Sequence, residues 1–199
     1  MVSAASGTGK TSLCRRLLTT LSYVERSVSY TTRAPRGEEL DGRDYHFIDD
    51  AKFDEMIAGD AFIEWAEVFG QRYGTGEAAV RRQLEDGVDV FLDIDVQGGL
   101  QIRERFPDAL LIFLLPPSLD ELRRRLVNRA TDAPDEIERR LREARSEIAQ
   151  CRGYDYLVVN DDFDKAAADL RGIVVAARSR ASRNGALVDV LEDGGRTSG

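Results

Sequence analysis

Apolar and polar positions along the chain follow two different periods, and these periods predict helices and strands in turn. Residues 11–21 repeat apolar side chains every three or four positions, which is typical of a helix with one buried face. Short apolar runs at 88–92, 110–115 and 156–159 predict buried strands, and helical patterns lie between them. Parallel strands need long connections that usually contain a helix. The alternation therefore predicts an α/β protein with a three-layer core around a parallel sheet.

Two segments interrupt this alternation. Residues 30–85 are mixed, with hairpin-like strands expected around 45–48 and 62–66, and residues 119–150 are helical and rich in arginine. We predict that both are subdomains inserted over the sheet. The tail at 179–199 contains Ser, Arg, Gly and Asp around one apolar patch, and we expect its last residues to be disordered.

Charge and composition exclude several classes of protein. The 199 residues carry a net charge of −8, which argues against a nucleic-acid partner because binding to a polyanion relies on an excess of Lys and Arg. No stretch is apolar enough to span a bilayer, so we expect a cytoplasmic protein with no membrane partner. Two cysteines are too few for a disulfide framework, and the single His46 excludes mechanisms that need a histidine pair. The oligomeric state stays open.

Residues 4–11 predict a loop that binds the phosphates of ATP. The loop fits the phosphate-loop pattern except at Ala4, which stands where the pattern has its first glycine. Small residues let backbone amides surround phosphate oxygens at a helix start, while Lys10 adds charge near the β- and γ-phosphates and the Thr11 hydroxyl suits Mg²⁺. A Gly-rich turn before an ordinary helix would not require a lysine in a chain whose basic residues are mostly arginine. The predicted ATP-binding residues of the loop are Ala4, Ala5, Ser6, Gly7, Thr8, Gly9, Lys10, Thr11 and Ser12.

The next segment suggests an acceptor that carries a phosphate. Residues 29–36 place Arg33 and Arg36 close together on an extended stretch, because the proline between them disfavours a helix. Two guanidinium groups can hold one phosphate through several charge-assisted hydrogen bonds, and Tyr45 and Tyr73 can add phenolic donors. Loop arginines are by default solvated, so this pair alone would not establish a site.

Several longer motifs, in order, resemble those of the guanylate kinase family. They lie at residues 27–36, 42–47, 62–66, 73–75 and 92–98, and the similarity extends from the phosphate loop to about residue 177. The resemblance implies a kinase of purine nucleotide metabolism that transfers the γ-phosphoryl group of ATP to GMP, with Mg²⁺ as cofactor. It also implies a guanylate kinase-like domain at 1–178, with a P-loop NTPase core (1–29, 86–117 and 151–178), a mixed α+β GMP-binding subdomain (30–85) and a helical lid (118–150).

The resemblance assigns roles within the acceptor site. It implies that the base is read by Ser29, Glu64 and Thr75, and that the GMP phosphate is held by Arg33, Arg36, Tyr45 and Tyr73. Guanine presents its N1–H and 2-amino donors side by side, so an acceptor-only carboxylate can accept from both, whereas adenine has no donor at N1. Asp93 and Asp95 follow a predicted strand, where open α/β sheets bind their ligands. By resemblance they lie beside Mg²⁺ and GMP, with Asp93 and Thr11 as the metal candidates and the division of roles between the two aspartates open.

The arginine-rich segment is the expected lid. A run of charges on a helix is usually a solvated face, but the resemblance singles out Arg125, Arg129 and Arg140, together with Lys10, as catalytic. Phosphoryl transfer develops charge on the oxygens of the moving group, and arginines on a closing lid can stabilise that charge and expel water. By resemblance Asn160 contacts the adenine of ATP.

Two alternative functions stay open from the sequence. One is a guanylate-kinase-like binding module without catalysis, which the retained phosphate-loop lysine and lid arginines count against. The other is a kinase of a different phosphorylated acceptor, such as a ribose bisphosphate, which would have no use for Glu64. Family members normally have several apolar residues before the loop, but only three residues precede Ala4. We therefore expect a shortened first strand and a product that starts upstream of Met1.

Overall fold

The structure, a computed structural model, describes residues 1–68, 70–128 and 134–194. Its core is a parallel sheet with the strand order β2-β7-β1-β8-β9, in which a bridge between Val2 and Asp93 joins β1 to the β2–β7 pair. The predicted buried strands are confirmed in place and in direction. The strands of this sheet are β1 (Val2–Ala4), β2 (Val24–Arg26), β7 (Asp89–Phe91), β8 (Ile112–Leu115) and β9 (Tyr156–Val159).

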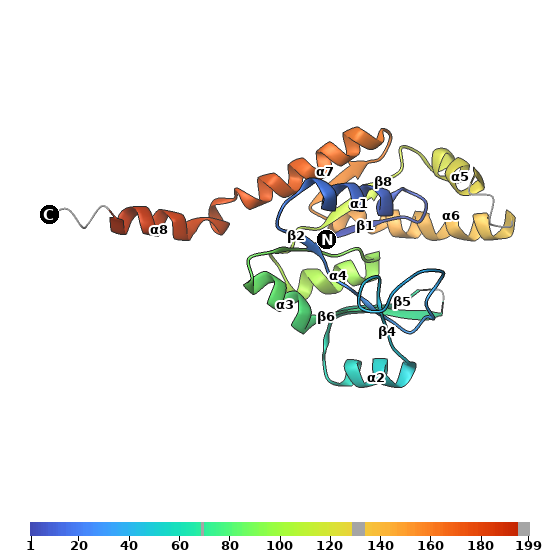
Figure 1. The fold of residues 1–199 in the computed structure, drawn as a ribbon. Coiled ribbons are helices and arrows are strands. Elements are labelled where there is room, and N and C mark those ends of the chain that lie inside the picture. The colour runs from blue at the N-terminus through green and yellow to red at the C-terminus, as the bar shows by residue number, and fades with distance from the viewer. Residues whose placement is uncertain (69, 129–133, 195–199) are drawn as a thin grey trace.

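Helices cover both faces of this sheet, which gives the three predicted layers (Figure 1). One apolar cluster joins one face to α1 (Lys10–Thr20) and α7 (Phe163–Arg178). A second cluster joins the other face to α3 (Glu77–Glu85) and α4 (Val96–Arg105). Strand β8 serves both clusters, because successive side chains of a strand point to opposite faces of the sheet. The predicted three-layer α/β core around a parallel sheet is thereby confirmed.

A smaller mixed sheet, with the order β4-β3-β6-β5, lies beside the core and below it in Figure 1. Strands lie near both positions predicted for this region, but they are not partners of each other. Strand β5 forms an antiparallel hairpin with β6, whereas β4 pairs in parallel with β3. Helix α2 packs on this sheet through Phe53, whose ring lies 4.6 Å from that of Phe62. The elements are β3 (Tyr30–Thr31), β4 (His46–Phe47), α2 (Asp50–Ala58), β5 (Phe62–Val68) and β6 (Gln71–Gly76).

Two helices in the predicted lid segment, α5 (Leu119–Asn128) and α6 (Pro134–Ala149), pack on each other through a separate apolar cluster. That cluster includes Ala5 of the phosphate loop, so these helices cover the loop itself. A short 3₁₀ turn, η1 (Cys151–Gly153), follows α6. After α7 come a second short 3₁₀ turn, η2 (Ala181–Arg183), and α8 (Gly185–Gly194), which projects away from the core (Figure 1). The described part of the tail is thus helical, and the disorder expected for the last residues concerns 195–199, which lie outside the described residues.

None of the helices within the described ranges is long and apolar enough to cross a membrane. Both cysteines, Cys14 and Cys151, are buried and free, as expected of reduced packing residues.

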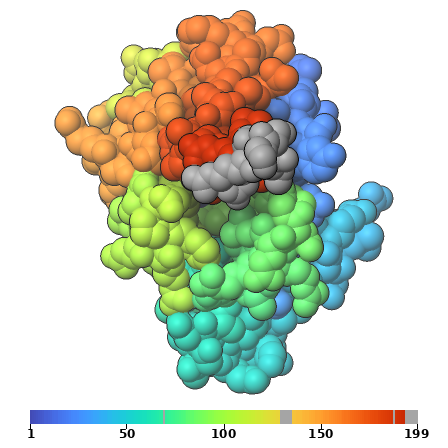
Figure 2. All heavy atoms as spheres, turned by 90° about the vertical axis from the view of Figure 1, so that its left-hand side faces the viewer, coloured from blue at the N-terminus to red at the C-terminus, as the bar shows by residue number. Residues whose placement is uncertain are grey.

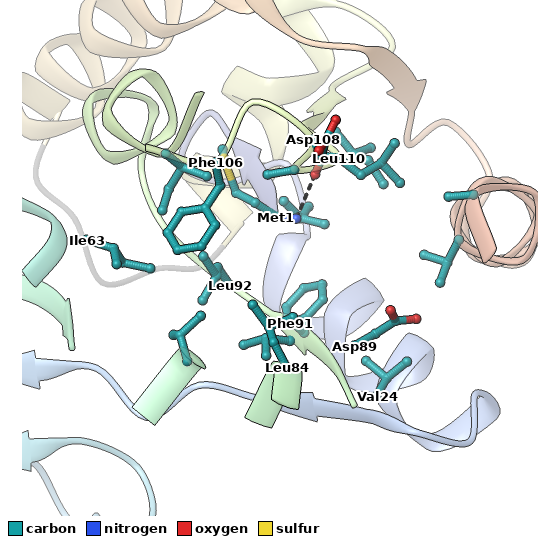
Figure 3. A pocket seen from close by; sticks show the side chains of 18 of the residues that line it. Met1, Val24, Ile63, Leu84, Asp89, Phe91, Leu92, Phe106, Asp108 and Leu110 are labelled. Carbon is teal, nitrogen blue, oxygen red and sulfur yellow. Dashed lines mark hydrogen bonds between the residues drawn. The ribbon is translucent and has the colours of Figure 1, made fainter. Parts of the chain in front are cut away.

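A cavity of about 400 Å³ lies beside the amino end of β1, at the edge of the sheet opposite the phosphate loop (Figure 3). Figure 2 shows a hollow below α8, between the surfaces of α3 and α4, which both contribute to its lining. Asp93 bridges with Val2, and β7 begins four residues earlier, at Asp89. Within the described residues, the edge of β7 that faces β1 therefore has no partner strand over the part that precedes Met1. The amino group of Met1 donates to the Leu110 carbonyl over 2.8 Å, and burial lowers the pKa of this amino group to about 6.

We expect a short apolar extension before Met1, such as Val-Ile-Val, to stabilise the fold. In the register of β1 it would lie between the edge of β7 and residues 108–110, which precede β8, fill part of the cavity, and replace a buried amino group by a peptide N–H. Burial of a single apolar side chain contributes roughly 2 kcal/mol, so we expect Tm to rise by about 4 °C or more. Thermal unfolding measures the effect. A Gly-Ser-Gly extension is the control, and an equal Tm for the two extensions would contradict this prediction.

Candidate functional site

The phosphate loop connects β1 to α1 and has the backbone that phosphate binding requires. Gly7 and Gly9 adopt φ values of 92° and 99°, which only glycine adopts without strain. A Cβ at Gly9 would also lie 2.6 Å from Nδ2 of Asn160. No side chain caps the first turn of α1, so its free amides and its positive end point toward the loop. The loop therefore offers backbone donors where an anion would bind.

Lys10 is the first residue of α1, and its side chain reaches the carboxyl end of β7 and one of the predicted metal candidates, Asp93. Its Nζ forms an ion pair with Oδ1 of Asp93 at 2.5 Å and donates to the carbonyl of Ile94 over 3.2 Å. Thr11 is exposed on the next position of α1. The described ranges contain no group of three or more His, Cys, Asp or Glu side chains that could hold a metal. Mg²⁺ typically takes one or two protein carboxylates and completes its shell with substrate phosphates and water, so Asp93 and Thr11 fit it.

Two of the predicted lid arginines reach the phosphate loop. Arg125 of α5 donates to the carbonyl of Thr8 over 3.3 Å and to the carbonyl of Asn160 over 3.0 Å. Arg140 of α6 donates to the Ser6 hydroxyl over 2.6 Å. The Asn160 side chain, which is buried, also donates to the Thr8 carbonyl over 2.6 Å. Side chains from α5, α6 and the end of β9 therefore meet on one loop, whereas Arg129 lies outside the described residues.

The residues predicted to read guanine lie on neighbouring strands of the small sheet. Glu64 of β5 is 4% exposed, and Thr75, its partner in β6, donates to its Oε1 over 2.5 Å. Strand β3 pairs with β6 through Tyr30 and Gly74, and this antiparallel register continues to place Ser29 opposite Thr75. Burial raises the pKa of Glu64 to about 7. A buried carboxylate has two acceptor oxygens and no donor, which suits a base with two adjacent N–H groups.

The residues predicted to hold the acceptor phosphate only partly converge. The Arg33 guanidinium lies 5.0 Å from the ring centroid of Tyr45, whose ring is 5.9 Å from that of Tyr73. Arg36 lies exposed on the following loop. Glu39 joins the two arginines, because it pairs with Arg33 at 2.7 Å and accepts from the Arg36 amide over 2.8 Å. Hydrogen bonds from Arg33 and Arg36 lower the pKa of Glu39 to about 2.

The two halves of this site are joined by the connection between β7 and α4. Within that connection Asp93 pairs with Lys10, and just past its other end Gly98, in the first turn of α4, lies against the Glu64 carboxylate. Between them, Asp95 caps α4 by accepting from the Gly98 amide over 2.8 Å. A phosphate-binding loop and a buried carboxylate that suits guanine thus share one short segment, and Asp95 is placed in it as a structural cap.

Comparison with known proteins agrees with this geometry. The family model for guanylate kinase matches residues 1–177. The chain belongs to the guanylate kinase family. A curated guanylate kinase of Alkalilimnicola ehrlichii is 51% identical over 194 residues, which cover 97% of this chain and 96% of the relative. A guanylate kinase of Neisseria meningitidis serogroup B is 50% identical over 194 residues, with 97% and 95% covered. The crystal structure of guanylate kinase from Anaplasma phagocytophilum superimposes with a TM-score of 0.75 at 34% identity, covering 92% of this chain and 86% of that one.

Four residues that contact the candidate site were not identified from the sequence: Glu39, Glu121, Glu147 and Gly98. Glu39 orients Arg33 and Arg36, and Glu121 accepts from Arg125 over 2.8 Å. The only available signals were an acidic residue six positions after Arg33 and an i, i+4 pair on a helix, and both patterns are common on protein surfaces. The others, Glu147 and Gly98, gave no local signal, because their roles depend on residues far away in the sequence.

Glu147 of α6 faces the phosphate loop. Burial is the main cause that raises its pKa to about 7, and the backbone amide of Ser6 donates a hydrogen bond that acts in the opposite direction. Between the ordinary glutamate value of 4.5 and about 7, the folded state therefore binds more protons at Glu64 and Glu147 than the unfolded state does. The contribution of both groups to the free energy of unfolding falls as the pH rises through that window.

We expect the affinity for GMP to depend on pH through Glu64. In the unliganded protein its carboxyl is largely protonated below about pH 7, whereas the carboxylate is the form that accepts both guanine donors. Binding then releases a proton, and the Kd for GMP should rise toward tenfold per unit as the pH falls from about 7 to about 5. Calorimetry measures this slope. The GMP phosphate itself titrates near pH 6, so Glu64→Gln supplies the baseline, and equal slopes in both proteins would contradict the prediction.

Proposed function

We propose that this chain transfers the γ-phosphoryl group of ATP to GMP, giving ADP and GDP. The observation that carries the proposal is the connection from Asp93 to Gly98, which contacts the phosphate-loop lysine at one end and the Glu64 carboxylate at the other. Donor and acceptor sites that share one short segment can hold two nucleotides with their phosphates facing each other. Positioning of this kind is the main protein contribution to phosphoryl transfer.

In this proposal the donor side is formed by the phosphate loop and the lid. Backbone amides of residues 4–12 and Lys10 surround the β- and γ-phosphates, and Asn160 lies on the adenine side. Arg125 and Arg140 already contact the loop from two helices, so both guanidiniums stand near the oxygens on which charge develops during transfer. Arg129 is proposed to act with them, from outside the described residues.

On the acceptor side, Glu64, Ser29 and Thr75 read the guanine, and the phosphate of GMP is held by Arg33, Arg36, Tyr45 and Tyr73. Mg²⁺ would be held by the Thr11 hydroxyl and Asp93 together with the nucleotide phosphates, and when bound it neutralises part of the phosphate charge. Lys10 shares the Asp93 carboxylate with that site, since the two already form an ion pair at 2.5 Å. The catalytic role is therefore one of charge and orientation, with no covalent intermediate on the protein.

The subdomain boundaries follow the same division of labour. We propose the core at 1–29, 86–117 and 151–178, the GMP-binding subdomain at 30–85 and the lid at 118–150, with 179–199 as a tail. A cytoplasmic location and the absence of a nucleic-acid partner stay predictions from the sequence. The oligomeric state stays open.

A coupled assay of ADP formation tests the proposed activity. Purified protein with ATP, Mg²⁺ and GMP is expected to form ADP and GDP in equal amounts, and EDTA should abolish turnover. AMP in place of GMP should support little turnover, because Glu64 finds no donor at adenine N1. ADP formation no faster with GMP than without an acceptor would refute the activity and favour a binding module. Equal turnover with a ribose bisphosphate would favour the other alternative.

A further inference from the structure

Gly98 lies in the first turn of α4, and because it has no side chain it leaves the space that the Glu64 carboxylate occupies. A Cβ built at Gly98 would overlap Oε2 of Glu64 and would lie 3.0 Å from its Cδ and 3.2 Å from Cδ1 of Ile94. Contacts this short with a Cβ require the neighbouring atoms to move. Gly98 therefore stands against the buried carboxylate itself, and no larger residue fits while the carboxylate stays there.

Neither partner of this contact can give way easily. Glu64 is 4% exposed, and Thr75 holds its other oxygen at 2.5 Å. On the opposite side, the Gly98 amide is fixed by its 2.8 Å hydrogen bond to Asp95. The buried Ser3 hydroxyl donates to the carbonyls of Ile94 over 2.9 Å and of Asp95 over 3.1 Å, which fixes the residues before the helix.

The close approach also has an electrostatic consequence. The amino-terminal end of a helix carries a partial positive charge, which favours a nearby anion within the first turn. Because Gly98 has no side chain, the carboxylate lies directly against that turn of α4. The helix end thereby offsets part of the cost of burying the charged form, which is the form that can accept from guanine. Gly99 differs, since a Cβ there would meet the Tyr154 hydroxyl and Met1, which lie in or against the second apolar cluster.

We propose that Gly98 is a specificity-determining position for the acceptor base: it keeps open the space in which Glu64 reads guanine, and any side chain there turns the carboxylate away. The proposal rests on the proposed reading of guanine by Glu64. Gly98 is a positioning residue, since it acts through Glu64 rather than by touching the reacting atoms.

The test is Gly98→Ala with steady-state kinetics for both substrates. We expect KM for GMP to rise about tenfold or more and the preference for GMP over AMP to fall by a similar factor, because the displaced carboxylate leaves guanine donors unpaired. KM for ATP should stay within about twofold, since the phosphate loop is untouched. Gly172→Ala in α7 is the matched control, because a Cβ at Gly172 meets nothing within 4 Å, and its kinetic constants should equal those of the parent.

A double-mutant cycle separates this role from a merely structural one. Glu64→Gln already weakens the interaction between residue 64 and guanine, so Gly98→Ala should cost much less GMP affinity in that background than in the parent. If the two positions acted independently, their effects on GMP affinity would add. If Gly98→Ala alone does not fold, Gly98→Ala with Glu64→Ala should fold with a Tm close to that of Glu64→Ala. The overlap with Oε2 is then gone, and of the closest contacts only the 3.2 Å one with Cδ1 of Ile94, the end of a flexible side chain, remains. Additive effects, or a double variant that also fails to fold, would overturn the proposal. If Glu64→Gln itself leaves the GMP/AMP preference unchanged, the reading of guanine by Glu64 fails instead.

Discussion

Replacing Lys10 by alanine is expected to lower kcat for GMP phosphorylation by about 10²–10³-fold, which is the usual effect of removing one preorganised electrostatic contact to the transition state. Lys10 is the flexible positive charge of the phosphate loop, and its Nζ already points to the carboxyl end of β7, where it pairs with Asp93. GMP affinity should change little, because the groups proposed to bind GMP lie on the small sheet and the loops beside it. The loss should therefore fall on turnover and on the ATP side.

Steady-state kinetics for ATP and GMP, together with calorimetry for GMP, measure this separation. Lys52→Ala is a matched control, because Lys52 is an exposed lysine of α2 whose only salt bridge in the described structure is a surface pair with Glu55 at 2.8 Å. Its kinetic constants should equal those of the parent, since exposed pairs of this kind contribute about 1 kcal/mol or less. A parallel loss of GMP affinity and turnover in Lys10→Ala would show that the donor and acceptor sites are not separate in the way we propose.

The parts of this fold that could be predicted from sequence are those whose signal is local. The runs at 110–115 and 156–159 are apolar throughout, which is typical of strands in a parallel sheet, and both are strands of the core sheet. Of the two, only β8 is buried on both faces, since β9 is the last strand of the sheet and leaves Leu157 and Val159 51% and 42% exposed. The phosphate loop could be predicted because its chemistry lies within consecutive residues. Helix α6 was expected from the arginine-rich segment, whose apolar positions follow a helical period.

What the sequence could not provide depends on contacts between distant residues. Strands near 45–48 and 62–66 were expected, but their pairing partners, β3 and β6, are set by the way the small sheet closes rather than by either run alone. The contact of Gly98 with Glu64 joins two elements that are far apart in the chain. Glu147 reads as one more charge of a solvated helix until α6 is seen to lie on the phosphate loop. A glycine or a carboxylate has no local signature for a neighbour that only the fold supplies.

The apolar patch of the tail shows the same limit in another form. Residues 186–191 were seen as an apolar patch, and the structure forms a helix there, α8, on which Val190 and Leu191 are 69% and 77% exposed. Apolar periodicity predicts that a helix has an apolar side, but it does not say what that side packs against. Burial in α1 and exposure in α8 follow from the sheet, which lies under the first helix and not under the second.

The second large effect is expected from Glu64→Gln, which should reduce the preference for GMP over AMP by about 10- to 100-fold. The carboxylate can accept from the N1–H and the 2-amino group of guanine together, whereas the amide must turn its NH₂ toward one of them. A hydrogen-bond partner lost from a buried site costs roughly 1–3 kcal/mol, which corresponds to that range of affinity. Turnover at saturating GMP should fall less than KM rises, because Glu64 binds the base and lies away from the transferred phosphoryl group.

The measurement is kcat/KM for GMP and for AMP in the same preparation, with Glu67→Gln as the matched control. Glu67 lies on the same strand, β5, but is exposed, so its replacement tests the change of charge without the change of site. Glu64→Gln should also stabilise the unliganded protein above about pH 7, since it removes a buried carboxyl whose pKa is raised to about 7. A variant that gains Tm at neutral pH while it loses guanine preference would show that the Glu64 carboxylate is needed to recognise the base but lowers the stability of the unliganded fold. An unchanged preference between GMP and AMP would instead reduce Glu64 to a structural carboxyl and remove the chemical basis for guanine selection.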